Sequence, residues 1–203
     1  MNITIIGTGN VGGALATNWS KKGHRINLGV QDVNNFKGIE LLKNESTKVF
    51  SINEAVTKSE VILIAIPPTA IFNVIEKLGD VSGKVIIDAT NTVRQTPEPY
   101  KTVYHCLTDK TQAEVVKCFN STGFENMLNP IYNGEGIDMF MAGDSERAKY
   151  VAWQLALDNG FSSCLDFGKS DKVELLEKFA LSWINIAIMQ GHGRNMAFKV
   201  VRR

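Results

Sequence analysis

The chain has 203 residues, 44% of them hydrophobic, and its formal net charge at pH 7 is +1. A near-neutral chain has no broad electrostatic attraction to nucleic acid or to an anionic membrane, so we expect neither as a partner. The cysteines, Cys106, Cys118 and Cys164, are widely spaced and contain no C-x-x-C pair. The sequence therefore predicts neither a disulfide framework nor a metal site, and it fits a reducing cytoplasm.

A glycine-rich turn follows the first apolar run. The run ends at Gly7, glycines recur at Gly9 and Gly12, and a helical pattern then begins. This predicts a strand at the N-terminus, and not a signal peptide. We expect Gly7 to turn the chain, Gly9 to let a pyrophosphate approach the backbone, and Gly12 to let helix and strand pack closely. Free N–H groups and the helix dipole then favour phosphate, so the predicted dinucleotide site begins with Gly7, Thr8, Gly9, Asn10, Val11 and Gly12.

The residues after the second strand decide which dinucleotide binds. A helix over residues 10–22 and a strand over residues 25–30 complete a βαβ unit, which is followed by Gln31 and Asp32. Asp32 can accept the ribose hydroxyls of NAD, but it can equally cap the next helix or face solvent. Lys37 is the nearest downstream cation that could reach a phosphate. Gln31 and Asp32 are therefore candidate cofactor-binding residues, with NAD and NADP both open.

Two further strands should bring their ends to the same crevice. Residues 60–66 form a continuous apolar run, typical of a central parallel strand, and two prolines end it. Residues 83–91 form the next strand. Ligands of open α/β sheets lie over the carboxyl ends of the strands, so the predicted pocket includes Ile66, Pro67, Pro68 and Asn91. The alternatives are that the prolines only end the strand and that Asn91 is a turn residue.

The rest of the chain alternates short helices and strands. Helices are predicted from Ser51 onward and over residues 70–78, 100–111 and 144–159, with a short one within residues 34–44. Strands are predicted over residues 49–50, 114–119, 138–143 and 163–167. Residues 129–136 form a turn-rich loop that suits a second-substrate site or a lid.

The C-terminal part has a different pattern. Residues 173–189 are apolar over most of a helix surface, which predicts burial either in the monomer core or in a subunit interface. We expect a homodimer that forms through these C-terminal helices. A short amphipathic helix is expected over residues 198–203.

Six segments together carry a family resemblance: residues 7–12, 65–67, 88–91, 115–120, 138–144 and 193–199. In the order and spacing of these six segments, the chain resembles the coenzyme F420-dependent NADP oxidoreductases and the bacterial proteins grouped with them. The resemblance implies an α/β fold, a Rossmann-type doubly wound, mostly parallel sheet over residues 1–168, with a small helical extension over residues 169–203. It implies hydride transfer between a nicotinamide and a flavin-like or deazaflavin partner. It also implies that one side of the nicotinamide is lined by Asn120, Ser121 and Gly123.

One position departs from the family pattern. The family usually has Gly-Ser-Arg after the second strand, where Ser and Arg hold the 2′-phosphate of NADP. This chain has Gly29-Val30-Gln31 instead. The pyrophosphate site is intact, whereas the usual ligands of the 2′-phosphate are missing, which leaves NAD and NADP both open.

The sequence thus predicts an NAD(P)-dependent oxidoreductase that transfers a hydride to a flavin-like or F420-type deazaflavin acceptor. No catalytic side chain is predicted, because in a hydride transfer the two cofactors themselves donate and accept the hydride. The three histidines, His24, His105 and His192, are expected to have structural or solvent-exposed roles. Two other functions stay open: an imine or small-carbonyl reductase resembling pyrroline-carboxylate reductase, and a dinucleotide-binding sensor without turnover.

Overall fold

An eight-stranded sheet runs through the computed structural model, which describes residues 1–203. Its strands lie in the order β10-β9-β6-β5-β4-β1-β2-β3. They are β1 (Asn2–Ile6), β2 (Arg25–Val30), β3 (Thr47–Ser51), β4 (Val61–Ile64), β5 (Val85–Asp88), β6 (Glu114–Cys118), β9 (Asp138–Ala142) and β10 (Ser163–Asp166). Neighbouring strands are parallel except β6 and β9. The predicted doubly wound, mostly parallel α/β fold is confirmed.

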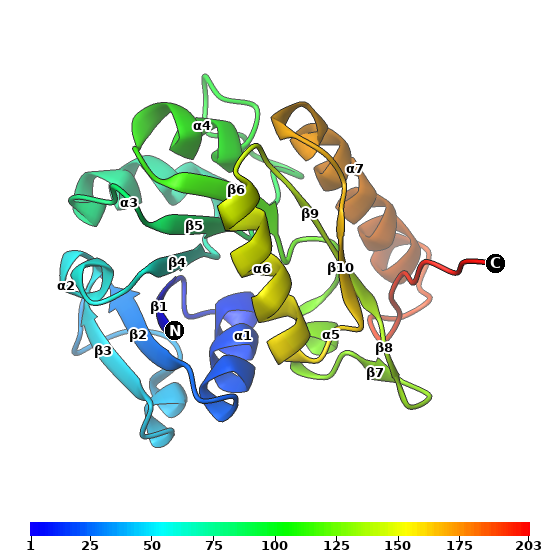
Figure 1. Cartoon of the computed structure of the whole chain (residues 1–203), viewed down its shortest axis with the longest axis horizontal. Helices are drawn as coiled ribbons and strands as arrows, with labels where there is room; N and C mark the ends of the chain where they lie inside the picture. The colour runs from blue at the N-terminus through cyan, green and yellow to red at the C-terminus, as the bar shows by residue number, and fades with distance from the viewer.

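Helices cover both faces of this sheet (Figure 1). One face carries α1 (Asn10–Lys21), α5 (Phe124–Leu128) and α6 (Glu146–Asn159). The other carries α2 (Ile52–Thr57), α3 (Ile71–Leu78), α4 (Val103–Lys110) and α7 (Val173–Ile184). Because strand side chains alternate, Val61 and Leu63 of β4 enter the first core cluster while Ile62 and Ile64 enter the second.

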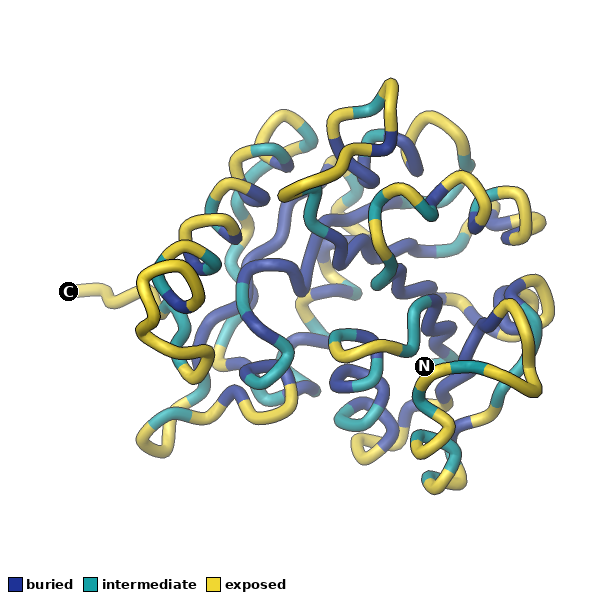
Figure 2. The backbone as a smooth tube through the Cα atoms, turned by 180° about the vertical axis from the view of Figure 1, so that it is seen from behind, coloured by how far each residue is buried: buried dark blue, intermediate teal, exposed yellow.

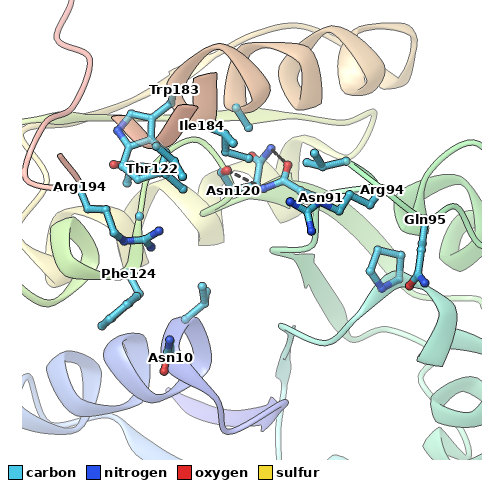
Figure 3. A pocket seen from close by; sticks show the side chains of 16 residues that line it. Asn10, Asn91, Arg94, Gln95, Asn120, Thr122, Phe124, Trp183, Ile184 and Arg194 are labelled. Carbon is cyan, nitrogen blue, oxygen red and sulfur yellow. Dashed lines mark hydrogen bonds between the residues drawn. The ribbon is translucent and has the colours of Figure 1, made fainter. Parts of the chain in front are cut away.

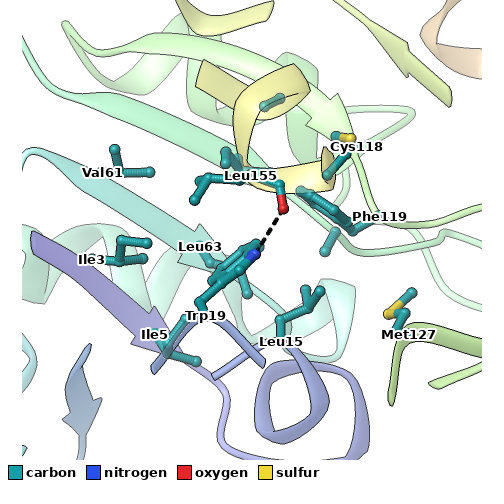
Figure 4. Close-up of a cluster of buried hydrophobic side chains, with 14 of the residues drawn as sticks. Ile3, Ile5, Leu15, Trp19, Val61, Leu63, Cys118, Phe119, Met127 and Leu155 are labelled. Atoms are coloured by element: carbon teal, nitrogen blue, oxygen red, sulfur yellow. Dashed lines mark hydrogen bonds between the residues drawn. The ribbon is translucent and has the colours of Figure 1, made fainter. Parts of the chain in front are cut away.

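Trp19 is the largest buried side chain of the first cluster (Figure 4). Its ring meets Phe119 edge-to-face at 5.4 Å, and its Nε1 donates a hydrogen bond of 2.9 Å to the carbonyl of Leu155 in α6. A buried indole N–H needs such a partner, so this bond fixes α1 against α6 across the core. Figure 2 shows the buried strands at the centre and the exposed helix surfaces and C-terminal tail around them.

The C-terminal part differs from the sequence-based prediction. A π-helix (Asn185–Met189) extends α7, but residues 190–203 contain no helix, so the predicted amphipathic helix over residues 198–203 is wrong. Nor is α7 buried all round. Val173, Leu176 and Trp183 are buried, whereas Leu175 is 51% exposed. The tail is instead held by side chains: Trp183 Nε1 and Asn126 Nδ2 both donate to the carbonyl of Met196.

Smaller differences have local causes. The turn-rich loop contains a hairpin of β7 (Ile131–Tyr132) and β8 (Glu135–Gly136), closed by Asn133 and Gly134 at positive φ, as Asn-Gly turns favour. The helix predicted over residues 100–111 begins at Val103, because the hydroxyl of Thr102 caps it by accepting the N–H of His105. The helix α5 and the 3₁₀-helices Ile39–Lys43, Pro68–Ala70 and Ser170–Lys172 complete the fold. None of the helices has the length and hydrophobicity needed to cross a bilayer.

Candidate functional site

The three glycines of the N-terminal turn have different surroundings. Gly7 has φ +98°, and a Cβ there would overlap the carbonyl oxygen of Ala65 after β4. A Cβ on Gly12 would overlap the carbonyl oxygen of Gly7. A Cβ on Gly9 would have no atom within 4 Å. Gly7 and Gly12 are therefore required by the fold itself, whereas Gly9 leaves an open cradle in front of α1.

The N-terminus of α1 has the features of an anion-binding site. Gly9 caps the helix without any side-chain hydrogen bond, and the first turn contains no acidic residue. The first N–H groups of a helix lack partners within it, and its dipole favours negative charge there. Thr8 contributes differently, because its hydroxyl donates to the carbonyl of Lys37 and closes the turn against the loop after β2.

A cavity of about 620 Å³ lies beside this turn, over the ends of β1, β2 and β4. It brings together most of the residues predicted to bind the dinucleotide, namely Gly7, Thr8, Gly9, Gln31, Asp32, Ile66 and Pro67. Lys37 lines the same cavity. Asp32 is exposed, and its Oδ1 accepts the N–H of Asn34 at 2.9 Å, while its other carboxylate oxygen has no partner in the protein. The carboxylate therefore shapes its own loop and still offers one oxygen to the cavity.

A second cavity, of about 480 Å³, continues from the helix end to α7 (Figure 3). Asn10, Val11, Pro68, Asn91 and Asn120 line it, so all the remaining predicted residues except Gly12 lie here. Gly12 lines neither cavity, since it is buried in the packing of α1 against the turn. Gly123 lines the second cavity, but Ser121 does not: it is buried, and its hydroxyl lies 3.4 Å from the sulfur of Met139.

Sequence reasoning missed four large side chains of this second cavity: Arg94, Phe124, Trp183 and Arg194. Phe124 and Trp183 lie 5.6 Å from the guanidinium carbon of Arg194, measured to their ring centroids, and Glu125 forms an ion pair with Arg194. Arg94 comes from the loop after β5, and Phe124, Trp183 and Arg194 come from α5, α7 and the C-terminal tail (Figure 3). Only the return of the tail over α7 brings them together, and no local sequence pattern signals that return.

Asn91 and Asn120 form one wall of the second cavity. Phe119, at the end of β6, has φ +60°, and this left-handed conformation turns the chain so that its ring enters the core and Asn120 reaches the cavity. Asn120 is 4% exposed, and its Oδ1 is buried without a hydrogen-bond partner in the protein. A buried acceptor without a partner costs free energy unless a ligand donor meets it.

These features fit a dinucleotide. The open space at Gly9 suits a pyrophosphate, the first cavity suits the adenosine half, and Asn120, whose buried Oδ1 has no partner in the protein, lines the second cavity. No group of three or more His, Cys, Asp or Glu side chains is placed to hold a metal ion.

Known proteins with related sequences support the same interpretation. Residues 2–92 match the family model of the coenzyme F420-dependent NADP oxidoreductases. The family resemblance seen in the sequence and the family model therefore agree over this segment. The segment runs from β1 to just beyond β5, so it contains the glycine-rich turn, Gln31, Asp32, Pro67 and Asn91.

One curated relative is a glycerol-3-phosphate dehydrogenase [NAD(P)+] from Thermoanaerobacter sp. (strain X514), 33% identical over 98 residues. The match covers 43% of this chain and 30% of the relative, so the chain spans less than a third of that protein. The family model and this relative both describe NAD(P)-dependent oxidoreductases.

Solved structures share the fold over a longer part of the chain. A protein from Arthrobacter sp. FB24, provisionally assigned as an F420-dependent NADP reductase, has a TM-score of 0.86 and 20% identity, with 100% of both chains covered. An imine reductase from Streptomyces aurantiacus has a TM-score of 0.69 and 17% identity, and the match covers 94% of this chain and 64% of that one. At these identities, the likeness establishes the fold alone.

Proposed function

We propose that this chain is an NAD(P)-dependent oxidoreductase that transfers a hydride between a nicotinamide dinucleotide and a flavin-like or F420-type deazaflavin acceptor. The observation that carries this proposal is the composition of the second cavity. Its lining consists of apolar and aromatic side chains, amides, a threonine and two guanidinium groups. A hydride that passes between two planar rings needs little more than a dry slot that holds the rings together.

Each part of the site has a role in this proposal. The bound dinucleotide supplies the hydride. The free N–H groups of α1 bind its pyrophosphate, and Asn120 Oδ1 accepts an N–H of its nicotinamide half. Phe124, Trp183 and Ile184 give the acceptor an apolar surface to pack on and exclude water from the second cavity. Catalysis then rests on orientation rather than on a general acid.

The same lining disfavours an imine or carbonyl reductase. Reduction of an imine or a carbonyl needs a proton as well as a hydride, and enzymes usually supply it from a positioned His, Tyr, Lys or carboxylic acid. None of the residues that line the second cavity is of these types. The fold is shared with imine reductases, but the fold does not determine the reaction.

The test is oxidation of NADH and NADPH, followed by absorbance at 340 nm, with FMN, FAD and F420 as separate acceptors. We expect turnover with at least one of them and none with pyrroline-5-carboxylate. Turnover with pyrroline-5-carboxylate alone would favour the imine-reductase alternative. Tight binding of one dinucleotide without turnover by any acceptor would favour a sensor.

We also propose a homodimer that forms through the exposed side of the C-terminal helix. Leu175, Leu181 and Met189 are all at least 39% exposed along α7 and its π-helical extension. Several exposed apolar side chains along one helix are typical of a surface that a partner covers. The division into residues 1–168 and 169–203 remains a proposal, supported by a sheet that lies wholly within the first part.

A cytoplasmic location completes the proposal. It is supported by three cysteines that are free and buried. Cys118 and Cys164 have sulfur atoms only 3.7 Å apart, but β9 lies between their strands. Side chains two strands apart start from Cα atoms about 9–10 Å apart, beyond the reach of a disulfide without movement of the backbone.

A further inference from the structure

A buried group of charged side chains, Lys117, Asp88 and Glu177, lies outside the lining of the second cavity. Lys117 of β6 and Asp88 of β5 are both 0% exposed, and the Nζ of Lys117 lies 3.0 Å from Asp88 Oδ2. The same Nζ lies 2.5 Å from Oε1 of Glu177, which α7 brings into the core. Burial raises the pKa of the Asp88 carboxyl, and the shorter of the two contacts of Lys117 is the one with Glu177.

Glu177 is exceptional on its helix. The other buried residues of α7 are Val173, Leu176, Ala180 and Trp183, all apolar. Taking a carboxylate and an ammonium out of water is expensive, and apolar side chains of similar volume often pack at least as stably. Stability alone is therefore a weak reason for an acid at this position.

The second carboxylate oxygen of Glu177 binds the loop after β5. Its Oε2 accepts the backbone N–H of Thr92 at 2.9 Å and also accepts the hydroxyl of Thr92. One carboxylate thus joins three elements, since Lys117 belongs to β6, Thr92 to the loop after β5, and Glu177 itself to α7.

The loop after β5 and α7 carry two neighbouring parts of the lining of the second cavity. Asn91, Val93 and Arg94 flank Thr92 and belong to one part. Ala180, Trp183 and Ile184 belong to the other, three to seven residues after Glu177 on the same helix. Residues at those spacings lie one to two turns along the helix, close to one side of it. The carboxylate therefore holds these two parts of the lining at a fixed separation.

We infer that Glu177 is a positioning residue of the acceptor site, which fixes the loop after β5 against α7 through Thr92 and Lys117. This inference rests on the proposed function, because the second cavity is the acceptor site only if that proposal holds. Glu177 itself does not line the cavity and contacts no reacting group. It acts through the residues that do.

The test compares Glu177→Gln with a matched change on the same helix. Gln keeps the shape and an acceptor for Thr92 but removes the charge that faces Lys117. We expect kcat/KM for the acceptor to fall by about 10- to 100-fold, because small misplacements of bound reactants have effects of this size. The control is Glu174→Gln. Glu174 forms a surface ion pair of 3.1 Å with Lys101 and makes no bond to Thr92, so this variant should behave as wild type.

A second variant checks the connection to the loop. Thr92→Val keeps the N–H and the shape but loses the hydroxyl, so it should lower kcat/KM in the same direction by a smaller factor. Because Thr92 and Glu177 act through one contact, the double variant should be no worse than Glu177→Gln alone. Independent, multiplicative effects of the two changes would overturn the inference, as would an unchanged acceptor KM and kcat in Glu177→Gln.

Amide hydrogen exchange tests, without any turnover, whether Glu177 fixes the loop after β5 against α7. In Glu177→Gln, residues 89–95 and 177–189 should exchange faster, while residues 2–16 should exchange as in wild type. Uniformly faster exchange would indicate general destabilisation and would overturn the positioning role. A wild-type protein without NAD(P)H oxidation by any acceptor would refute the proposed function, and the exchange pattern would then still decide whether Glu177 fixes this loop against α7.

Discussion

Asn91 and Asn120 exchange two hydrogen bonds across the ends of β5 and β6. Asn91 Nδ2 donates to the carbonyl of Asn120 at 2.8 Å, and Asn120 Nδ2 donates to Asn91 Oδ1 at 3.0 Å. The pair uses every polar atom of the Asn91 side chain and leaves only Asn120 Oδ1 free. One asparagine thus orients the other toward the cavity.

Replacing Asn91 should therefore damage both the fold and the site. Asn91→Ala leaves the carbonyl and the Nδ2 of Asn120 without their partners, which should lower the free energy of unfolding by about 1–3 kcal/mol. We also expect weaker binding of the dinucleotide, because Asn120 loses its fixed orientation. Urea denaturation and NADPH titration measure the two effects. Asn34→Ala, at an exposed position that lines neither cavity, is the control.

Alanine substitutions at Gly9 and Gly12 should affect dinucleotide binding and folding stability separately. Gly9→Ala adds a methyl group into open space, so the melting temperature should stay near that of wild type while dinucleotide binding weakens by tenfold or more, an order-of-magnitude expectation for a blocked pyrophosphate cradle. Gly12→Ala places a methyl group against the carbonyl of Gly7, so it should lower the melting temperature. Wild-type affinity in a folded Gly9→Ala protein would show that the pyrophosphate lies elsewhere.

Gln31 should govern the choice of dinucleotide. It lies at the rim of the first cavity, at the position where the family usually has an arginine for the 2′-phosphate. Gln31→Arg should strengthen NADPH binding by roughly tenfold, the worth of one exposed charge-assisted hydrogen bond, and leave NADH binding unchanged. Fluorescence titration with both dinucleotides measures this. A wild-type preference for NADPH would instead implicate Lys37, which lines the same cavity, or Thr8.

The capping box at the start of α2 should make stability depend on pH. The hydroxyl and N–H of Ser51 donate to the Glu54 carboxylate and lower its pKa. A carboxyl whose pKa is lower in the folded state stabilises the fold above its unfolded pKa, and this stabilisation disappears as the pH falls through the folded value. Glu54→Gln should therefore melt below wild type at pH 7, and the difference should shrink as the pH falls through the lowered pKa of Glu54.

Ser51→Ala serves as the comparison for the capping box. Ser51 Oγ also accepts the N–H of Glu54, and loss of such a cap costs about 1 kcal/mol. Part of this cost does not depend on the Glu54 charge, so it should persist at low pH. Equal melting of Ser51→Ala and wild type at low pH would contradict this account.

The exposed side of α7 should control oligomeric state. Leu175→Glu together with Met189→Glu places charges on the proposed interface, where Leu175 is 51% and Met189 63% exposed. Sedimentation velocity should show a dimer for wild type and a monomer for this variant. Tyr150→Glu, on the exposed side of α6, should leave the dimer intact. A monomeric wild-type protein would contradict the interface.

The sequence by itself determined the sheet, the glycine-rich turn and many of the residues that line the first cavity beside it. These features depend on local rules, since apolar runs form central strands, glycines permit the turn at Gly7 and the packing at Gly12, and strand ends line one edge of the sheet. The tertiary structure alone decided the other part of the second cavity. Trp183 and Arg194 line one cavity with Asn91 only because α7 packs on the sheet and the tail folds back over it. The role of Glu177 could not be predicted from the sequence either. Its partners Lys117 and Thr92 are sixty and eighty-five residues away along the chain, and only the fold brings them to this acid in an apolar helix.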